Sequence, residues 1–302
     1  MIELHTHRFS AMASPCAFHF HSESIWQAED IALAGWSEVS RIERKYSRYI
    51  SDNALDDIND AAKSGRSVAV DEETAELLDF AFSCFGMSDG LFDITSGVLR
   101  SLWNFKSGRL PDPGAIARLL PLIGMEKLRW NKPRLGFDQP GMQLDFGGIA
   151  KEYAADRVRS VFSNEGVLHC LVDLGGDLAA IGPHPDGTAW RIGIKDPSDA
   201  TRSLATVLLA KGGMATSGDY ENKIVVGGKR FGHLLNPKTG WPVKGLVSVT
   251  ALAPSCMAAG AAASIAMLKG NEGPRWLHNA HLAFLSVETT GRQVNALPSI
   301  YP

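Results

Sequence analysis

The sequence lacks the short motifs that most readily indicate a function. Among its 302 residues there are only four cysteines and no CxxC pair, so a zinc site or a disulfide framework is not expected. The GxGxxG and GxxxxGK(S/T) patterns of common phosphate-binding loops are missing, and so is the GxSxG of many serine hydrolases. The function therefore has to be sought in patterns spread along the chain.

An excess of positive charge is also missing. The chain has 30 Lys and Arg against 33 Asp and Glu, a formal net charge of -3, which gives no reason to expect a nucleic-acid partner. No run of about 18 uncharged apolar residues is present, so we expect no membrane insertion. The first residues lack the basic and apolar regions of a secretion signal, and the cysteines are scattered, which together predict a reducing, cytoplasmic location.

The order of helical and strand patterns predicts the fold class. Helical patterns at residues 24–46, 72–85 and 150–164 come first. Strand patterns follow at residues 167–174, 190–196, 204–210, 223–228 and 246–253, then a small-residue helix at 256–268 and a hairpin at 283–297. Because strands and helices do not alternate regularly, we expect an α+β fold with a largely antiparallel sheet core and packed helices. No convincing linker divides the chain, which predicts a single domain over residues 1–302.

The first strand and helix are predicted in more detail. Cys16, Phe18 and Phe20 would share one strand face, with His19 and His21 opposite. Ser24 followed by Gln27 has the form of a capping box that begins a helix. The apolar residues of this helix that step by three or four, and should face the core, are Ala32, Trp36, Val39, Ile42 and Tyr46.

Two pairs of histidines could in principle bind a metal. His5 with His7, and His19 with His21, each place two imidazoles on one face of a strand. No carboxylate or thiolate stands at a matching spacing, so we interpret these histidines as structural or surface residues.

Five clusters of glycine and polar residues remain, at residues 89–97, 145–151, 173–177, 216–220 and 233–240. In the second cluster, Gly147 and Gly148 leave backbone groups accessible just before a helix begins. A helix N-terminus favours an anion, and Lys151 adds a full positive charge nearby. One such cluster is equally well explained as a turn, but five in one chain favour a ligand site.

Taken in order, these clusters resemble the ApbE family, the FAD:protein FMN transferases. The resemblance runs from about Phe9 to about Gly270 and rests on order and spacing rather than on any single segment. The matching segments are MAS (12–14), YS (46–47), GLFDITSGVLRSLWNF (90–105), LDFGGIAKEYAAD (144–156), LVDLGGDLAAIG (171–182), ATSGDY (215–220), HLLNPKTGWPV (233–243) and VSVTALA (247–253).

The resemblance implies a T-fold-like α+β architecture and an Mg²⁺-dependent transferase. Such an enzyme cleaves FAD, releases AMP and attaches FMN by a phosphoester to a Thr or Ser of an acceptor flavoprotein. His233 matches the active-site histidine of the family, and the Gly148 carbonyl and Ser264 hydroxyl match its metal ligands. The residues that match its FAD contacts are Met12, Tyr46, Leu91, Phe92, Asp93, Asp145, Lys151, Asp177, Thr216 and Leu234.

The residue types suit this chemistry. Phosphoryl transfer requires mainly positioning and charge neutralisation, which Lys151 and a metal ion could supply. A histidine that titrates near neutrality can accept the proton of an attacking hydroxyl. Phe92, Tyr46 and Trp103 could offer flat apolar surface to the flavin or adenine rings, although Trp103 and Phe105 are better explained as core residues.

Three positions depart from the family pattern. Gly260 stands where the family has the Asp that binds metal, Asn236 replaces the Asp of a His-x-x-Asp-Pro motif, and Glu152 replaces a Gly after the lysine. Two alternatives therefore stay open. One is an FAD-binding paralogue with a lapsed metal site, in which Gly260→Asp should restore metal-dependent chemistry. The other is an FAD pyrophosphatase, in which water replaces the acceptor hydroxyl.

Overall fold

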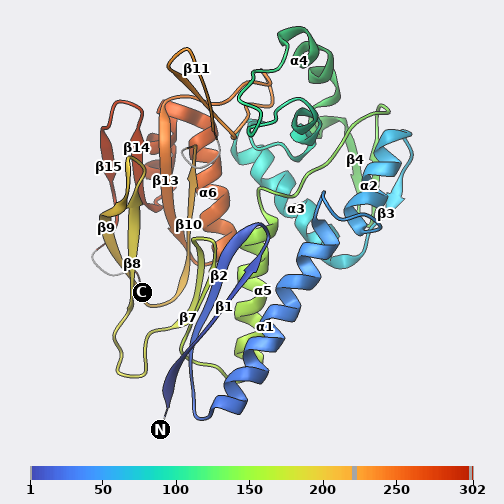
Figure 1. Ribbon diagram of the computed structural model, residues 1–302. Coiled ribbons are helices and arrows are strands. Elements are labelled where there is room, and N and C mark those ends of the chain that lie inside the picture. Colours follow the sequence, from blue (N-terminus) through green and yellow to red (C-terminus); the bar gives the residue numbers. More distant parts are fainter. Residues whose placement is uncertain (1, 220–222, 299–300, 302) are drawn as a thin grey trace.

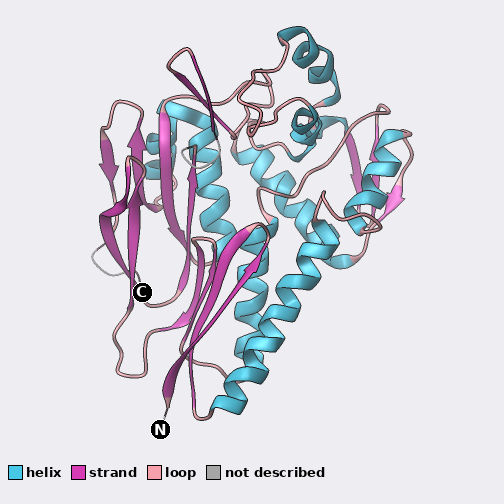
Figure 2. Cartoon of the chain, in the orientation of Figure 1, coloured by secondary structure: helices cyan, strands magenta, loops and turns pink. Residues whose placement is uncertain are grey.

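The computed structural model describes every residue except 1, 220–222, 299–300 and 302, and it is built on one large antiparallel sheet (Figures 1 and 2). Among the described residues this sheet has eight strands in the order β1-β2-β6-β7-β10-β13-β14-β15. Its strands are β1 (Glu3–Ala11), β2 (Ser14–Ser22), β6 (Cys170–Leu174), β7 (Asp177–Gly182), β10 (Gly212–Gly218), β13 (Leu246–Ala253), β14 (Ala283–Glu288) and β15 (Gln293–Asn295). The predicted α+β class with an antiparallel sheet is thus confirmed.

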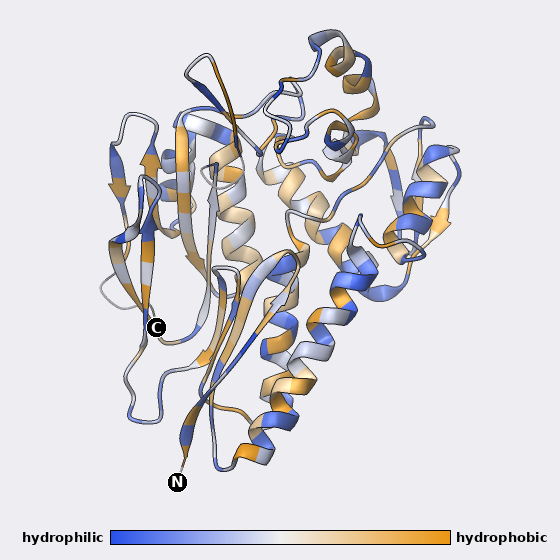
Figure 3. Cartoon of the chain, in the orientation of Figure 1, coloured by the Kyte–Doolittle hydropathy of each residue, from blue (hydrophilic) through white to orange (hydrophobic). Residues whose placement is uncertain are grey.

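Three long helices cover one face of the sheet. Helix α1 (Ile25–Tyr46) contacts β1 and β2, α5 (Ala150–Asn164) contacts β6 and β7, and α6 (Cys256–Lys269) contacts β10 and β13 (Figure 1). The amphipathic α1 carries both hydrophilic and hydrophobic residues along its length, whereas most of α6 is pale to orange (Figure 3). Most of α6 is buried, and its small side chains allow the helix to pack closely on the sheet.

The predicted start of α1 is confirmed, but one residue of its apolar stripe is not. The Gln27 amide donates to Ser24 Oγ at 3.2 Å, as expected for a cap. Trp36 is 42% exposed, which corrects its predicted place in the core. Gly35 takes the inner position instead, and a Cβ added there would lie 2.6 Å from Cε1 of Phe162. Because α1 approaches this ring so closely, no side chain fits on that face of the turn.

The other face of the sheet is covered by a long hairpin, β8 (Trp190–Asp196) and β9 (Asp199–Leu209). Trp190, Ile194 and Leu209 pack there against Leu178 and Leu285 of the sheet. The part of the sheet around β13 is therefore buried on both sides, and this explains why β13 is apolar along nearly its whole length.

A second group of elements lies on the side of the helices away from the large sheet, at the right of Figure 1. It contains α2 (Ala54–Lys63), α3 (Glu72–Met87), α4 (Pro113–Leu119) and a small sheet of β3 (Val68–Ala69), β5 (Arg134–Phe137) and β4 (Leu128–Asn131). The other elements are β11 (Lys223–Val226), β12 (Lys229–Gly232), α7 (Gly273–Asn279) and the 3₁₀ segments η1 (Ile94–Ser101), η2 (Leu120–Leu122), η3 (Met125–Lys127) and η4 (Gly270–Glu272).

The loop after β12 is fastened to this second group. The indole nitrogen of Trp103 donates to the Gly240 carbonyl at 2.9 Å, and the ring meets Trp241 edge to face. Lys238 Nζ donates to the Asp89 carbonyl at 2.8 Å. Trp103 is 3% exposed, so the structure supports the core interpretation of this residue.

Neither a membrane-spanning helix nor a cluster of metal-binding His, Cys, Asp and Glu side chains is present among the described residues. Within the described ranges, no helix combines the length and apolar character needed to cross a bilayer. The same part of the chain holds no group of three or more His, Cys, Asp or Glu side chains arranged to bind a metal.

Candidate active site

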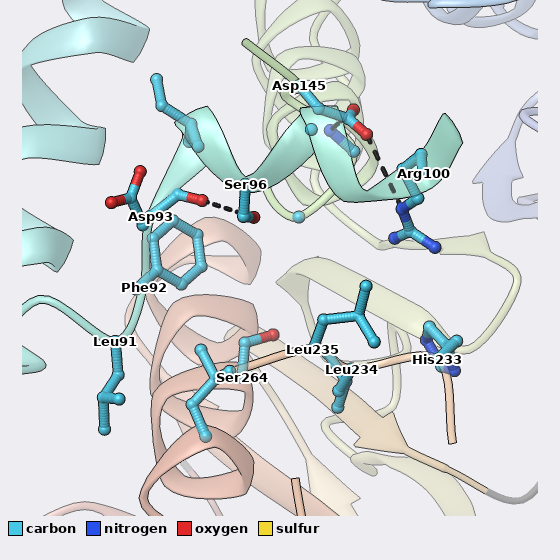
Figure 4. Close-up of a pocket in the computed structure, with 15 residues that line it drawn as sticks. Leu91, Phe92, Asp93, Ser96, Arg100, Asp145, His233, Leu234, Leu235 and Ser264 are labelled. Atoms are coloured by element: carbon cyan, nitrogen blue, oxygen red, sulfur yellow. Dashed lines mark hydrogen bonds and ion pairs between the residues drawn. The ribbon is translucent and has the colours of Figure 1, made fainter. Parts of the chain in front are cut away.

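A pocket lies between the start of η1, the loop before α5, the loop after β12 and helix α6 (Figure 4). In Figure 4, Asp93, Ser96, Arg100 and Asp145 lie along one side, and His233, Leu234, Leu235 and Ser264 lie along the other. Eight of the residues predicted from the sequence line it, namely Leu91, Phe92, Asp93, Asp145, Gly148, His233, Leu234 and Ser264. Ile94, Ser96, Gly97, Arg100, Gly147, Leu235 and Leu268 complete the lining.

Asp93 shapes this pocket through its own hydrogen bonds. One carboxylate oxygen accepts from the amide and the hydroxyl of Thr95, at 2.8 and 2.6 Å, and the other accepts from the Met125 amide at 3.2 Å. Burial raises the pKa of Asp93, although these donors counteract the effect. The carboxylate thus caps the N-terminus of η1 and links this segment to the backbone of Met125.

Asp145 gathers two arginines beside the pocket. Its Oδ2 lies 3.0 Å from Arg48 Nη1 and 3.9 Å from Arg100 Nε, and its Oδ1 accepts from the Gly147 amide at 2.8 Å. Neither arginine was predicted to contact the ligand. Arg48 follows directly after the matching segment Tyr46-Ser47, and Arg100 lies within the matching segment at residues 90–105. The signal was their charge next to a segment expected to bind phosphates.

The start of α5 and the middle of α6 meet at this pocket. Ile149, the residue at the N-cap of α5, provides no side-chain hydrogen bond, so the first turn of the helix is not capped by a side chain. The Ser264 hydroxyl is 2.8 Å from the Ser217 hydroxyl of β10. Gly148 and Ser264, predicted as metal ligands, thus both face one pocket.

Lys151, Asp177 and Thr216 form a separate group that is not part of the pocket lining. Lys151 Nζ contacts Asp177 Oδ2 at 2.7 Å, and the Thr216 backbone also hydrogen-bonds to Asp177. Burial opposes the charge of Lys151, but the attraction of Asp177 raises its pKa overall. Burial also raises the pKa of Asp177, and this exceeds the opposite effect of Lys151.

Glu152, the neighbour of Lys151, has a strongly raised pKa. Burial, reinforced by the charge of Asp177, raises the pKa of Glu152 to about 8. Its side chain points toward α6, where a Cβ at Gly260 would lie 2.5 Å from Glu152 Cγ.

Met12 and Tyr46 lie outside the pocket. Met12 has φ +50° in the β1–β2 turn, its amide donates to Glu43 at 2.8 Å, and it lines a second hollow with residues 10–15. Tyr46 is 3% exposed, and its hydroxyl is 3.0 Å from that of Thr74. Tyr220 of the ATSGDY motif lies outside the described residues.

The loop that carries His233 is held by backbone hydrogen bonds. The Val243 amide donates to the Leu234 carbonyl at 2.9 Å, and the Asn236 amide donates to the Trp241 carbonyl at 2.8 Å. Asn236 Oδ1 also accepts from the Lys238 amide at 2.8 Å. An amide oxygen forms this turn as an aspartate would, so the exchange of Asp for Asn at this position keeps the loop geometry.

Comparisons with known proteins identify relatives of this chain. The sequence profile of the ApbE family matches residues 12–285. The FAD:protein FMN transferase of Salmonella typhimurium is 33% identical over 226 residues, which cover 70% of this chain and 63% of that protein. The protein of the same name from Vibrio cholerae is 32% identical over 240 residues, which cover 78% of this chain and 72% of that one.

Solved structures resemble the whole chain. The crystal structure of the ApbE protein from Thermotoga maritima has a TM-score of 0.89 and 31% identity, and the match covers 97% of both chains. The flavin transferase ApbE from Vibrio cholerae has a TM-score of 0.88 and 26% identity, and the match covers 99% of this chain and 98% of that one.

Proposed function

This chain belongs to the ApbE family, and we propose that it is a transferase that moves FMN from FAD to an acceptor protein. The acceptor would be a flavoprotein with a Thr or Ser whose hydroxyl oxygen forms a phosphoester with FMN. The observation that carries the proposal is that eight residues matched by motif converge on one pocket from four separate parts of the chain. Convergence of this kind is not expected from turns that merely join neighbouring elements.

The pocket offers the surfaces that FAD requires. Phe92, Leu234 and Leu235 supply apolar area suited to a flavin ring. Arg100 borders the pocket and Arg48 lies behind it on Asp145, and these guanidinium groups can neutralise phosphate oxygens. The uncapped amides at the start of α5 favour an anion at the same place.

His233 would act as the general base. In the proposed reaction the acceptor hydroxyl oxygen attacks the phosphorus of the FMN half of FAD. The bond from this phosphorus to the bridging oxygen of the pyrophosphate breaks, and AMP leaves with the bridging oxygen. The hydroxyl proton passes to a His233 ring nitrogen, and histidine is the side chain that most often acts as a general base.

The residues present also fit a divalent cation such as Mg²⁺. Gly148 and Ser264 offer a carbonyl and a hydroxyl oxygen at the same pocket, and hard oxygen donors are those that Mg²⁺ prefers. When bound, such an ion would supply charge stabilisation for the leaving AMP.

The cytoplasm stays our prediction for the compartment in which the protein acts.

The proposal is tested with purified protein, FAD, Mg²⁺ and a small flavoprotein domain that carries an acceptor threonine. AMP is followed by chromatography and the acceptor by mass spectrometry, with EDTA as the control. We expect AMP release together with an FMN-sized gain in acceptor mass, both abolished by EDTA. The variant His233→Ala should bind FAD but lose transfer by about 100-fold or more, the usual range for a general base.

Other outcomes identify the alternatives. Free FMN with AMP and no covalent product, even with a competent acceptor, would indicate a pyrophosphatase. Tight FAD binding without either product, repeated with a second acceptor, would indicate an FAD-binding paralogue. Transfer at an unchanged rate in His233→Ala would refute the role of this histidine.

A further inference from the structure

Glu152 carries a buried carboxyl group whose hydrogen-bonding capacity is not fully satisfied among the described residues. It lies in the first turn of α5 and is only 9% exposed. In the described part of the chain, its buried Oε2 has no hydrogen-bond partner. Burial of an unpaired carboxylate oxygen is unfavourable, and buried charges are normally paired or coordinate a metal.

The Glu152 side chain fills the space in front of Gly260 on α6. A Cβ added at Gly260 would lie 2.5 Å from Glu152 Cγ and 2.7 Å from its Oε1. The Glu152 carboxyl group therefore occupies the volume in which a side chain at position 260 would begin. Residue 260 precedes Ser264 by four positions, so the two share one face of α6.

The charged groups around Glu152 do not include an ion-pair partner for it in the described part of the chain. Among the neighbouring acidic groups, Asp177 acts most strongly on Glu152. Among the described residues, Lys151 is the only cation in an ion pair with either carboxylate, and it contacts Asp177 at 2.7 Å. The Glu152 carboxyl group therefore has no ion-pair partner of its own in the described part of the chain.

We propose that Glu152 supplies the carboxylate ligand of a divalent-cation site that also uses the Ser264 hydroxyl and the Gly148 carbonyl. All three donors are hard oxygens, and a carboxylate is the usual protein anchor for Mg²⁺ or Mn²⁺. The inference rests on the proposed function for the purpose of the ion, but its test does not depend on catalysis.

The proposal explains two departures from the family pattern as a single exchange. The chain has Glu at 152 and Gly at 260, where the resemblance implies Gly and Asp. In a protein with the larger residue at both positions, the two side chains would collide, because the space in front of Gly260 is already occupied. The lapsed-site alternative implies that Gly260→Asp alone should restore metal-dependent chemistry. This single variant does not test that alternative by itself, because the new side chain would force Glu152 to move.

The experiment measures Mn²⁺ binding to the purified full chain by electron paramagnetic resonance of the free ion, without and with FAD. Glu152→Gln keeps the volume of the side chain and removes its charge. We expect its Mn²⁺ affinity to fall by about tenfold or more, since even outer-shell partners of metal ligands change affinity by about 10–100-fold. The matched control is Glu165→Gln, an exposed glutamate just after the other end of α5, which should bind as the unmodified chain does.

The double variant Glu152→Gly with Gly260→Asp tests the exchange itself. It should regain at least part of the affinity lost in Glu152→Gln, with folding confirmed by thermal melting. Unchanged Mn²⁺ binding in Glu152→Gln, or no binding by the unmodified chain in either condition, would overturn the proposal. Metal binding that depends on Glu152 without any FMN transfer would leave this inference standing and refute the proposed function instead.

Discussion

At the scale of single residues, arginines rather than the predicted lysine bring positive charge to the pocket edge. Lys151 is held by Asp177 at 2.7 Å and is not part of the pocket lining, so much of its charge is already neutralised. Arg100 is 3.9 Å from Asp145 and partly exposed, which leaves most of its donors available. Asp145 in turn is fixed by Arg48 and by the Gly147 amide. The structure thus separates a lysine that is already paired from an arginine that can bind phosphate.

Arg100→Gln should therefore weaken FAD binding. Hydrogen bonds to charged groups contribute about 1.5–3 kcal/mol, so we expect the Kd for FAD to rise by about tenfold or more. Titration of FAD by calorimetry measures the effect. Arg275→Gln is the matched control, because this exposed arginine on α7 lies at the long distance of 3.8 Å from Glu272. An equal loss of affinity in both variants would contradict a specific role for Arg100.

Tyr46 offers the opposite test, because the structure places a predicted FAD contact in the core. Its hydroxyl and that of Thr74 satisfy each other, and Thr74 is 1% exposed. Tyr46→Phe should lower the free energy of unfolding by about 1 kcal/mol and leave the Kd for FAD unchanged. Urea unfolding and FAD titration give the two numbers. Weaker FAD binding at unchanged stability would support Tyr46 as an FAD contact.

At the scale of elements, one carboxylate ties three helices together. Glu73, in the first turn of α3, accepts from Arg41 and Lys45 of α1, both at 2.6 Å, and from the Tyr153 hydroxyl of α5 at 2.9 Å. Hydrogen bonds from Arg41 first, and then from Lys45 and Tyr153, outweigh burial and hold the pKa of Glu73 at about 2. The ionised form is thus favoured in the folded protein.

The pH dependence of stability follows from this displaced pKa. Because the folded pKa lies below the unfolded value, Glu73 stabilises the protein fully above about pH 4.5, and this stabilisation is lost as the pH falls toward 2. Glu73→Gln should lower the free energy of unfolding by about 1–3 kcal/mol at pH 7, and the difference should shrink at acid pH. Denaturant unfolding at several pH values measures it. Glu72→Gln is the control, since its pair with Lys132 lies at the surface; a pH-independent difference would contradict ionisation as the cause.

The elements also show what the sequence could predict. Helix α5 and strands β8 and β13 have the predicted limits, because flanking glycines and apolar patterns act within or next to each segment. Strand β10 was not predicted, since its residues GGMATSG carry no apolar alternation and form a strand only between β7 and β13. The position of Glu152 against Gly260 was equally hidden, because it depends on how closely α5 and α6 approach.

At the scale of the whole molecule, the pocket joins parts of the chain that lie far apart in the sequence. Residues 91–100 and 145–148 line one side, and residues 233–235 and Ser264 line the other. The Trp103–Gly240 hydrogen bond and the pairing of Lys238 and Lys269 with Asp89 link the same two regions. FAD bound here would contact both, so its binding free energy should stabilise them together.

We therefore expect residues 1–302 to unfold in one cooperative transition that FAD shifts as a unit. A ligand that binds only the folded state at 100 times its Kd adds about 2.7 kcal/mol to the free energy of unfolding. Calorimetric melting with and without FAD measures the shift. In Arg100→Gln, a tenfold weaker Kd means that the same FAD concentration is only about ten times the Kd. About 1.4 kcal/mol of the stabilisation should then remain and about 1.3 kcal/mol should be lost. Two separate transitions, with FAD shifting only one, would show instead that the group around α2, α3 and α4 folds independently of the sheet.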